Sequence, residues 1–158
     1  MKGKITVVLS FVLIFVMLVS CGNNAFKADL TKYINEDLKE VTQLYNEISA
    51  ETVNWQLMSE NEHLLVSVRE NIIPRLEKIL KRLESMEISD KKIKALNDMY
   101  IKGIKKYQEG YALFAKALEK DDTDIYDSGS AIMEEGHKIL TRYFEDLDKL
   151  AKEQGIRE

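Results

Sequence analysis

After residue 28, apolar residues recur every three or four positions along most of the chain, which is the period of an amphipathic helix. The pattern predicts four helices, from about residue 27 or 29 to 50, then at about 59–86, 91–120 and 123–154, with a connector at 51–58. Short connections favour antiparallel neighbours, so we expect an all-α fold, an up-down-up-down four-helix bundle. A three-helix bundle with the first helix packed loosely against it is the alternative.

Local signals mark the ends of these helices. Ser59 followed by Glu62 is typical of a capping box, and Asp90 is placed to cap the third helix. Gly155 predicts the end of the fourth helix. Pro74 is the only proline in the chain and lies inside the second helix, where we expect a kink just before it.

The first twenty residues follow a different pattern. Lys2 and Lys4 form a basic start, and residues 5–19 are an apolar run of 15 residues interrupted only by Thr6 and Ser10. A membrane-spanning helix needs roughly 20 apolar residues, so this run is short for a permanent span. Its length is that of a signal-peptide core, and we therefore exclude residues 1–20 from the fold.

The run ends in Leu18-Val19-Ser20-Cys21, which resembles the lipobox of bacterial lipoproteins. The resemblance implies a diacylglyceryl group on the Cys21 thiol and cleavage between Ser20 and Cys21. Cys21 is the only cysteine, so no disulfide forms within the chain, and lipidation explains an otherwise free thiol. We expect a signal peptide at 1–20, a lipidated cysteine with a short tether at 21–28, and a helical domain at 29–158. An uncleaved or ordinarily cleaved signal peptide is the alternative.

The charge of the chain is acidic, with 27 Asp and Glu against 23 Lys and Arg. Removal of residues 1–20 removes two lysines and no acidic residue, which leaves 21 basic side chains and a formal charge of about −6. This charge argues against nucleic acid as a partner and against adsorption to anionic lipid. The lipid on Cys21 is therefore the expected link to the membrane, on its extracytoplasmic side.

Two Glu-x-x-His motifs, Glu60/His63 and Glu134/His137, have the spacing of the ligands in di-iron helical bundles. Their depth in the predicted bundle argues against a shared metal. His63 lies in the first turn of its helix and His137 some fourteen residues into a parallel helix, an offset of roughly 15 Å along the axis. The chain also lacks a glycine-rich phosphate loop and a nucleophile elbow. We therefore expect surface histidines, no metal or other cofactor, no catalytic residue and no enzyme activity.

Glycines recur seven residues apart, at 103 and 110 in the third helix and at 129 and 136 in the fourth. A glycine inside a helix costs about 1 kcal/mol relative to alanine, so four of them need a physical reason. Close packing of the third helix against the fourth is one interpretation. The other is a groove between these two helices, lined by Tyr100, Gly103, Tyr107, Tyr111, Gly129 and Gly136.

Three further segments are similar to the small helical-bundle lipoproteins of Bacillus-type Gram-positive bacteria. They are Tyr33-Ile34-Asn35-Glu36-Asp37-Leu38, Ile72-Ile73-Pro74 and Lys152-Glu153-Gln154-Gly155. The resemblance implies no particular activity. We therefore expect a non-enzymatic module that contacts another protein of the cell envelope, and the alternative is a lipoprotein that binds a small ligand or metal in the predicted groove.

Overall fold

The computed structural model describes residues 24–55 and 60–157, and within these ranges the chain is helical with no strand. The predicted all-α class is therefore confirmed. The helical segments after residues 24–32 are η1 (Tyr33–Asp37), α2 (Lys39–Asn54), α3 (Asn61–Val66), η3 (Ser67–Ile72), α4 (Ile73–Glu84), α5 (Lys91–Lys120) and α6 (Thr123–Glu153). The predicted signal peptide, Ser20, Cys21 and Ser59 lie outside the described residues.

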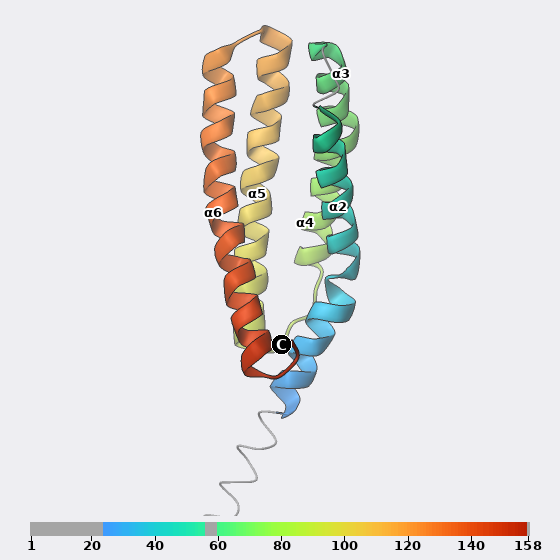
Figure 1. Ribbon diagram of the computed structural model, residues 1–158, viewed down its shortest axis with the longest axis vertical. Helices are drawn as coiled ribbons and strands as arrows, with labels where there is room; N and C mark the ends of the chain where they lie inside the picture. Colours follow the sequence, from blue (N-terminus) through green and yellow to red (C-terminus); the bar gives the residue numbers. More distant parts are fainter. Residues whose placement is uncertain (1–23, 56–59, 158) are drawn as a thin grey trace, which may run out of the picture.

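The helices lie side by side along the long axis of the molecule (Figure 1). The segments α3, η3 and α4 follow one another without a break, as do residues 24–32, η1 and α2 apart from a single turn residue, Leu38. The first described residues, the connection at 85–90 and the C-terminus lie at the same end of the molecule, and the turn between α5 and α6 lies at the other (Figure 1). None of the helices described is both long and apolar enough to cross a membrane.

The ends of α5 and α6 follow directly from local side-chain chemistry. The Asp90 carboxylate accepts hydrogen bonds from the backbone N–H groups of Lys92 and Ile93, at 2.7 and 3.1 Å. Asp122 caps α6 in the same way, after Asp121 has reversed the chain in a left-handed conformation with φ of 51°. Gly155 has φ of 62°, which a glycine adopts without strain, and ends α6. The predicted bounds of these two helices and the Gly155 stop are confirmed.

The first half of the chain departs further from the prediction. The first helix continues to Asn54 rather than ending near residue 50. Glu60, and not Ser59, occupies the position before α3, and its side chain makes no capping hydrogen bond. The wide turns of η3 come immediately before α4, whose first turn contains Pro74. Proline lacks an N–H and crowds the preceding turn, so the helix is irregular where the kink was expected.

One hydrophobic core is shared by all of these helices. Residues that are fully buried or nearly so come from the first helix, from the α3–α4 segment and from both long helices. They include Leu30, Tyr33, Val41, Ile72, Ile79, Leu83, Ile93, Ile104 and Tyr143. Burial of this apolar surface is the main favourable term that holds the helices together.

Candidate functional site

The four glycines form a close contact between α5 and α6, which we call the glycine seam (Gly103, Gly110, Gly129 and Gly136). All four are buried. A Cβ atom added to Gly136 would lie 3.1 Å from the Gly103 carbonyl oxygen, and one added to Gly129 would lie 3.0 Å from the Gly110 carbonyl oxygen. The two backbones therefore touch, and the absence of side chains is what allows this approach. The geometry agrees with the packing interpretation of the glycine pattern.

The six residues predicted to line a groove fall in three different places. Gly103, Gly129 and Gly136 belong to the glycine seam. Tyr100 is buried in a cluster of tyrosines toward the end of the molecule that holds the C-terminus. Tyr107 and Tyr111 line a cavity that α5 shares with α2 and α4. The structure therefore does not bring the six together around one groove between α5 and α6.

The cavity between α2, α4 and α5, called the tyrosine cavity from here on, has a volume of about 190 Å³. Its lining residues are Tyr45, Ile48, Ser49, Thr52, Leu76, Tyr107 and Tyr111. Ile48 and Leu76 are only 6% and 2% exposed, whereas Ser49 is exposed. The cavity thus combines buried apolar side chains with hydroxyl groups nearer to solvent.

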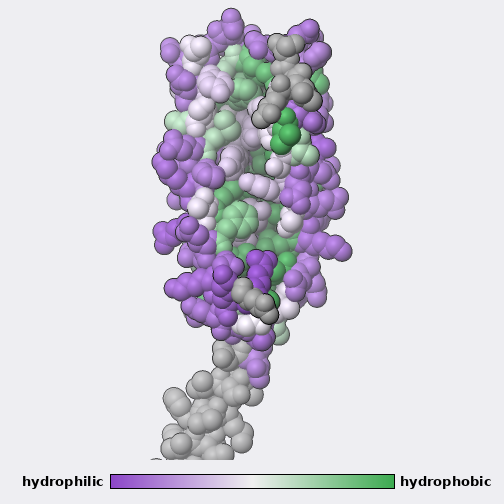
Figure 2. All heavy atoms as spheres, in the orientation of Figure 1, coloured by the Kyte–Doolittle hydropathy of each residue, from purple (hydrophilic) through white to green (hydrophobic). Residues whose placement is uncertain are grey.

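Hydrophobic side chains also gather along the middle of the face seen in Figure 2, between more polar margins.

The three tyrosines of the cavity are neutral at physiological pH. Burial raises the pKa of Tyr107 and of Tyr111 to about 12. Burial also raises the pKa of Tyr45, against a smaller opposing effect of its hydrogen bond with Tyr107. None of the seven lining residues therefore carries a charge. Each phenol keeps its proton and can donate a hydrogen bond.

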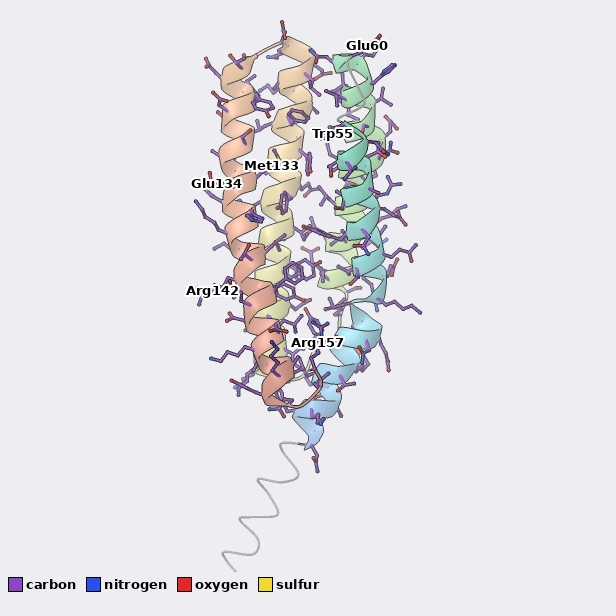
Figure 3. The ribbon with its side chains drawn as sticks, in the orientation of Figure 1. Trp55, Glu60, Met133, Glu134, Arg142 and Arg157 are labelled. Atoms are coloured by element: carbon purple, nitrogen blue, oxygen red, sulfur yellow. The ribbon has the colours of Figure 1, made fainter. Side chains whose placement is uncertain are left out.

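Trp55, at the end of α2, fixes one wall of the tyrosine cavity. Its ring is nearly perpendicular to that of Tyr111, at a centroid distance of 6.1 Å, and it stacks on Phe114 at 5.3 Å. Its indole Nε1–H donates a 2.8 Å hydrogen bond to the Ser67 Oγ atom. Figure 3 marks Trp55 beside α5, where these contacts are made. The Tyr111 ring is thereby held by contact with a side chain that is itself fixed by Phe114 and Ser67.

A polar network between α2, η3 and α4 holds Ser67, the residue that accepts the hydrogen bond from Trp55. The Ser67 hydroxyl donates to Glu51 Oε1 at 2.6 Å, and Asn71 Nδ2 donates to the same oxygen at 3.0 Å. Arg75 donates to Glu47 Oε2 at 3.0 Å and to the Asn71 carbonyl oxygen at 2.7 Å. The hydrogen bond from Arg75 is the main cause that lowers the pKa of Glu47. Glu47 and Glu51 of α2 are therefore engaged with α4 and η3.

No protein-family model, curated protein or solved structure matches this chain. The tyrosine cavity must therefore be interpreted from its own chemistry. Of its residues, the sequence pattern had singled out only Tyr107 and Tyr111. Tyr45 occupies an ordinary core position of its helix, and Trp55 was expected in a connector, so neither carried a signal of its own.

A second polar cluster, near the other end of the molecule, is enclosed by the core. The Tyr33 and Tyr143 hydroxyl oxygens lie 3.3 Å apart, and Tyr33 also donates to Asn97 Oδ1 at 3.4 Å. Asn97 Nδ2 donates to the Leu83 carbonyl oxygen at 2.9 Å, and Tyr100 stacks on Tyr143 at 4.4 Å. Burial raises the pKa of Tyr33 to about 12 and raises that of Tyr143 further. These groups satisfy one another inside the core, which is a structural role.

The Glu-x-x-His motifs lie on the surface. His63 and Glu60 are both exposed and their Nε2 and Oε2 atoms are 3.8 Å apart. Glu134 is exposed and pairs with Lys138 at 2.7 Å, and His137 is exposed as well. Figure 3 shows Glu60 near one end of the molecule and Glu134 well along α6 from that end. Within the residues that the structure describes, no group of three or more His, Cys, Asp or Glu side chains is arranged to hold a metal ion.

Proposed function

We propose that this chain is an extracytoplasmic lipoprotein, held to the membrane by diacylglyceryl on Cys21, whose up-down-up-down four-helix bundle is a non-enzymatic interaction module of the cell envelope. The N-terminal pattern supports the anchor: a basic start, an apolar run of 15 residues and the segment Leu18-Val19-Ser20-Cys21. Two acyl chains, as in a diacylglyceryl group, are enough for stable anchoring.

The observation that carries the proposal is the short distance along the chain between Cys21 and the folded domain. The first described helix begins at residue 24, at one end of the molecule (Figure 1). A lipid on Cys21 would hold this end against the membrane. Because α6 has 31 residues and a helix rises 1.5 Å per residue, the opposite end would stand about 45 Å away. The surface available to a partner is then the long flank and the far end of the bundle.

The charge of the mature chain supports an upright domain. At about −6 it is repelled by anionic headgroups, so the bundle has no electrostatic reason to lie on the membrane. Anchoring also confines the protein to the same surface as other membrane-bound proteins. Confinement raises the effective concentration of such partners, so a modest affinity is sufficient for association.

Cys21→Ala tests the anchor, with Ser10→Ala in the apolar run as the matched control. Cells are fed a fatty-acid analogue that carries a chemical tag, and the protein is followed by labelling and by membrane fractionation. We expect Cys21→Ala to lose the label and leave the membrane fraction or remain unprocessed, and Ser10→Ala to behave as the parent chain. Unchanged labelling of the Cys21→Ala chain would refute the anchor.

Crosslinking in cells, followed by mass spectrometry, tests the interaction module. We expect one or a few envelope proteins to be recovered reproducibly with the anchored chain. The Cys21→Ala chain should recover them less, because it is no longer confined to the membrane. Failure to recover any reproducible partner would count against this function while leaving the anchor intact.

The tyrosine cavity supports a second function, the binding of a small ligand. The cavity lies between α2, α4 and α5, and not between α5 and α6 where the groove was predicted. It includes two of the residues predicted for that groove, Tyr107 and Tyr111. Its enclosed apolar base and hydroxyl-bearing walls are the usual features of a small-molecule site.

A further inference from the structure

The tyrosine cavity contrasts in charge with the rest of the chain. Of all residues, 32% are Asp, Glu, Lys or Arg, yet none of them lines the cavity. The nearest α2 carboxylates, Glu47 and Glu51, are bonded to Arg75 and to Ser67 and Asn71. An ionic ligand would lose hydration on entering without gaining a counter-charge, which is unfavourable. The cavity chemistry therefore selects an uncharged occupant.

The volume of the cavity limits the size of that occupant. An apolar cavity of about 150 Å³ is large enough to bind benzene. The tyrosine cavity has about 190 Å³ and is partly open, so it has room for one ring with a small substituent. A larger molecule would have to extend into solvent past Ser49, which is the exposed member of the lining.

The lining also has two chemically different parts. Ile48 and Leu76 offer buried aliphatic surface, and the Tyr107 and Tyr111 rings lie 6.3 Å apart with their planes 26° from parallel. The hydroxyl groups of Ser49 and Thr52 and the phenols supply donors and acceptors. A ligand that matches both parts has an apolar ring and one hydroxyl or carbonyl group.

The walls are held before any ligand arrives. Tyr111 packs against Trp55, and Trp55 is fixed by Phe114 and by its hydrogen bond to Ser67 in η3. Wide helical turns of this kind are frequent at functional sites, and here the turns carry the serine that accepts the hydrogen bond from Trp55. Preorganised walls reduce the entropy lost when a ligand binds.

We infer that the tyrosine cavity binds a small neutral ring compound bearing a hydroxyl or carbonyl group. The inference deepens the second function proposed above and is independent of lipidation at Cys21. The ring lies against Ile48, Leu76 and Tyr111, and its polar atom is hydrogen bonded by the Tyr107 phenol.

Trp55 makes the inference testable, because it is the only tryptophan in the chain and it contacts the cavity wall. Tryptophan emission of the full chain, in a non-aromatic detergent, is titrated with benzyl alcohol, toluene, benzoate and benzylammonium. We expect benzyl alcohol to change the emission saturably. The affinity for benzoate and for benzylammonium should be at least about tenfold lower. Tyr107→Phe should lower the affinity for benzyl alcohol and leave the affinity for toluene unchanged, because the substitution removes only the phenol hydroxyl.

Ser49→Phe fills the mouth of the cavity from an exposed helical position, so the fold is not disturbed. Its matched control is Ser128→Phe, at an exposed serine of α6 outside the cavity. We expect Ser49→Phe to lower the affinity for benzyl alcohol by at least about tenfold. Ser128→Phe should leave this affinity unchanged. Equal binding by both variants, equal binding of the ions, or no saturable change with any neutral ring would overturn the inference. Cys21→Ala should bind like the parent chain, so failure of the anchor and failure of the cavity are distinguishable.

Discussion

The glycine seam makes Gly136→Ala an informative change, because two physical effects act on it with opposite signs. Alanine is favoured over glycine inside a helix by about 1 kcal/mol. Against this, the new Cβ would lie 3.0 Å from Lys106 Cβ, 3.1 Å from the Gly103 carbonyl oxygen and 3.4 Å from the Tyr107 nitrogen. Two of these atoms belong to the α5 backbone and cannot move without shifting that helix.

Overpacking of this kind costs about 1–3 kcal/mol, so the clash should exceed the gain in helix propensity. We expect Gly136→Ala to lower the free energy of unfolding by about 1 kcal/mol and the Tm by about 3 °C. Urea denaturation followed by circular dichroism measures the first quantity. Ser128→Ala, at an exposed position of the same helix, is the control and should be neutral or slightly stabilising. If Gly136→Ala instead raised stability by the full propensity gain, the seam would be loose and a groove between α5 and α6 would again be tenable.

Three other changes test the polar groups of the fold. Trp55→Phe should cost about 1–2 kcal/mol, and a double-mutant cycle with Ser67→Ala should show coupling through the 2.8 Å hydrogen bond; additive effects would contradict it. Tyr33 and Tyr143 have folded pKa values above the value of about 10 expected when unfolded, so their stabilising effect is present below pH 10 and is lost as pH rises from about 10 through 12. Urea midpoints at rising pH should therefore fall, and less steeply in Tyr33→Phe; an equal slope would contradict this assignment. Asp90→Ala removes two capping bonds and should cost about 1 kcal/mol by urea denaturation, whereas no loss would show that the cap is replaceable.

The second half of the fold was predictable because its determinants are local. Asp90, Asp122 and Gly155 each act on the two or three residues beside them, so helix ends can be inferred from the residues alone. The wide turns of η1 and η3 have no comparable signature. Pro74 marks where the second helix is disturbed, but no local pattern indicates that Ser67 and Asn71 of the irregular segment bond to Glu51 of α2.

The candidate site was predictable only in part, and helical geometry explains why. Tyr107 and Tyr111 follow Gly103 at intervals of four residues, so the sequence pattern assigns all three to one apolar stripe of α5. Four residues along a helix rotate the side chain by about 40°, so Tyr107 already points to one side of Gly103 and Tyr111 further still. A stripe predicts that a face is buried, but it does not predict which helix covers each part of it. That information comes only from the packing of α2 and α4 against α5.

The glycine seam joins α5 and α6 into one tightly packed hairpin, and we expect this half of the molecule to be more stable than the half that contains α2. Contact between α5 and α6 is far more extensive than between any other pair of described helices, and it joins segments that are adjacent in sequence. We expect such a hairpin of local contacts to form early in folding and to open last. We expect slow hydrogen exchange of backbone amides in α5 and α6 and faster exchange in α2; uniform protection would contradict this difference in stability. Because α2 supplies four of the seven residues that line the tyrosine cavity, a local opening of α2 would widen the cavity while the hairpin stays intact.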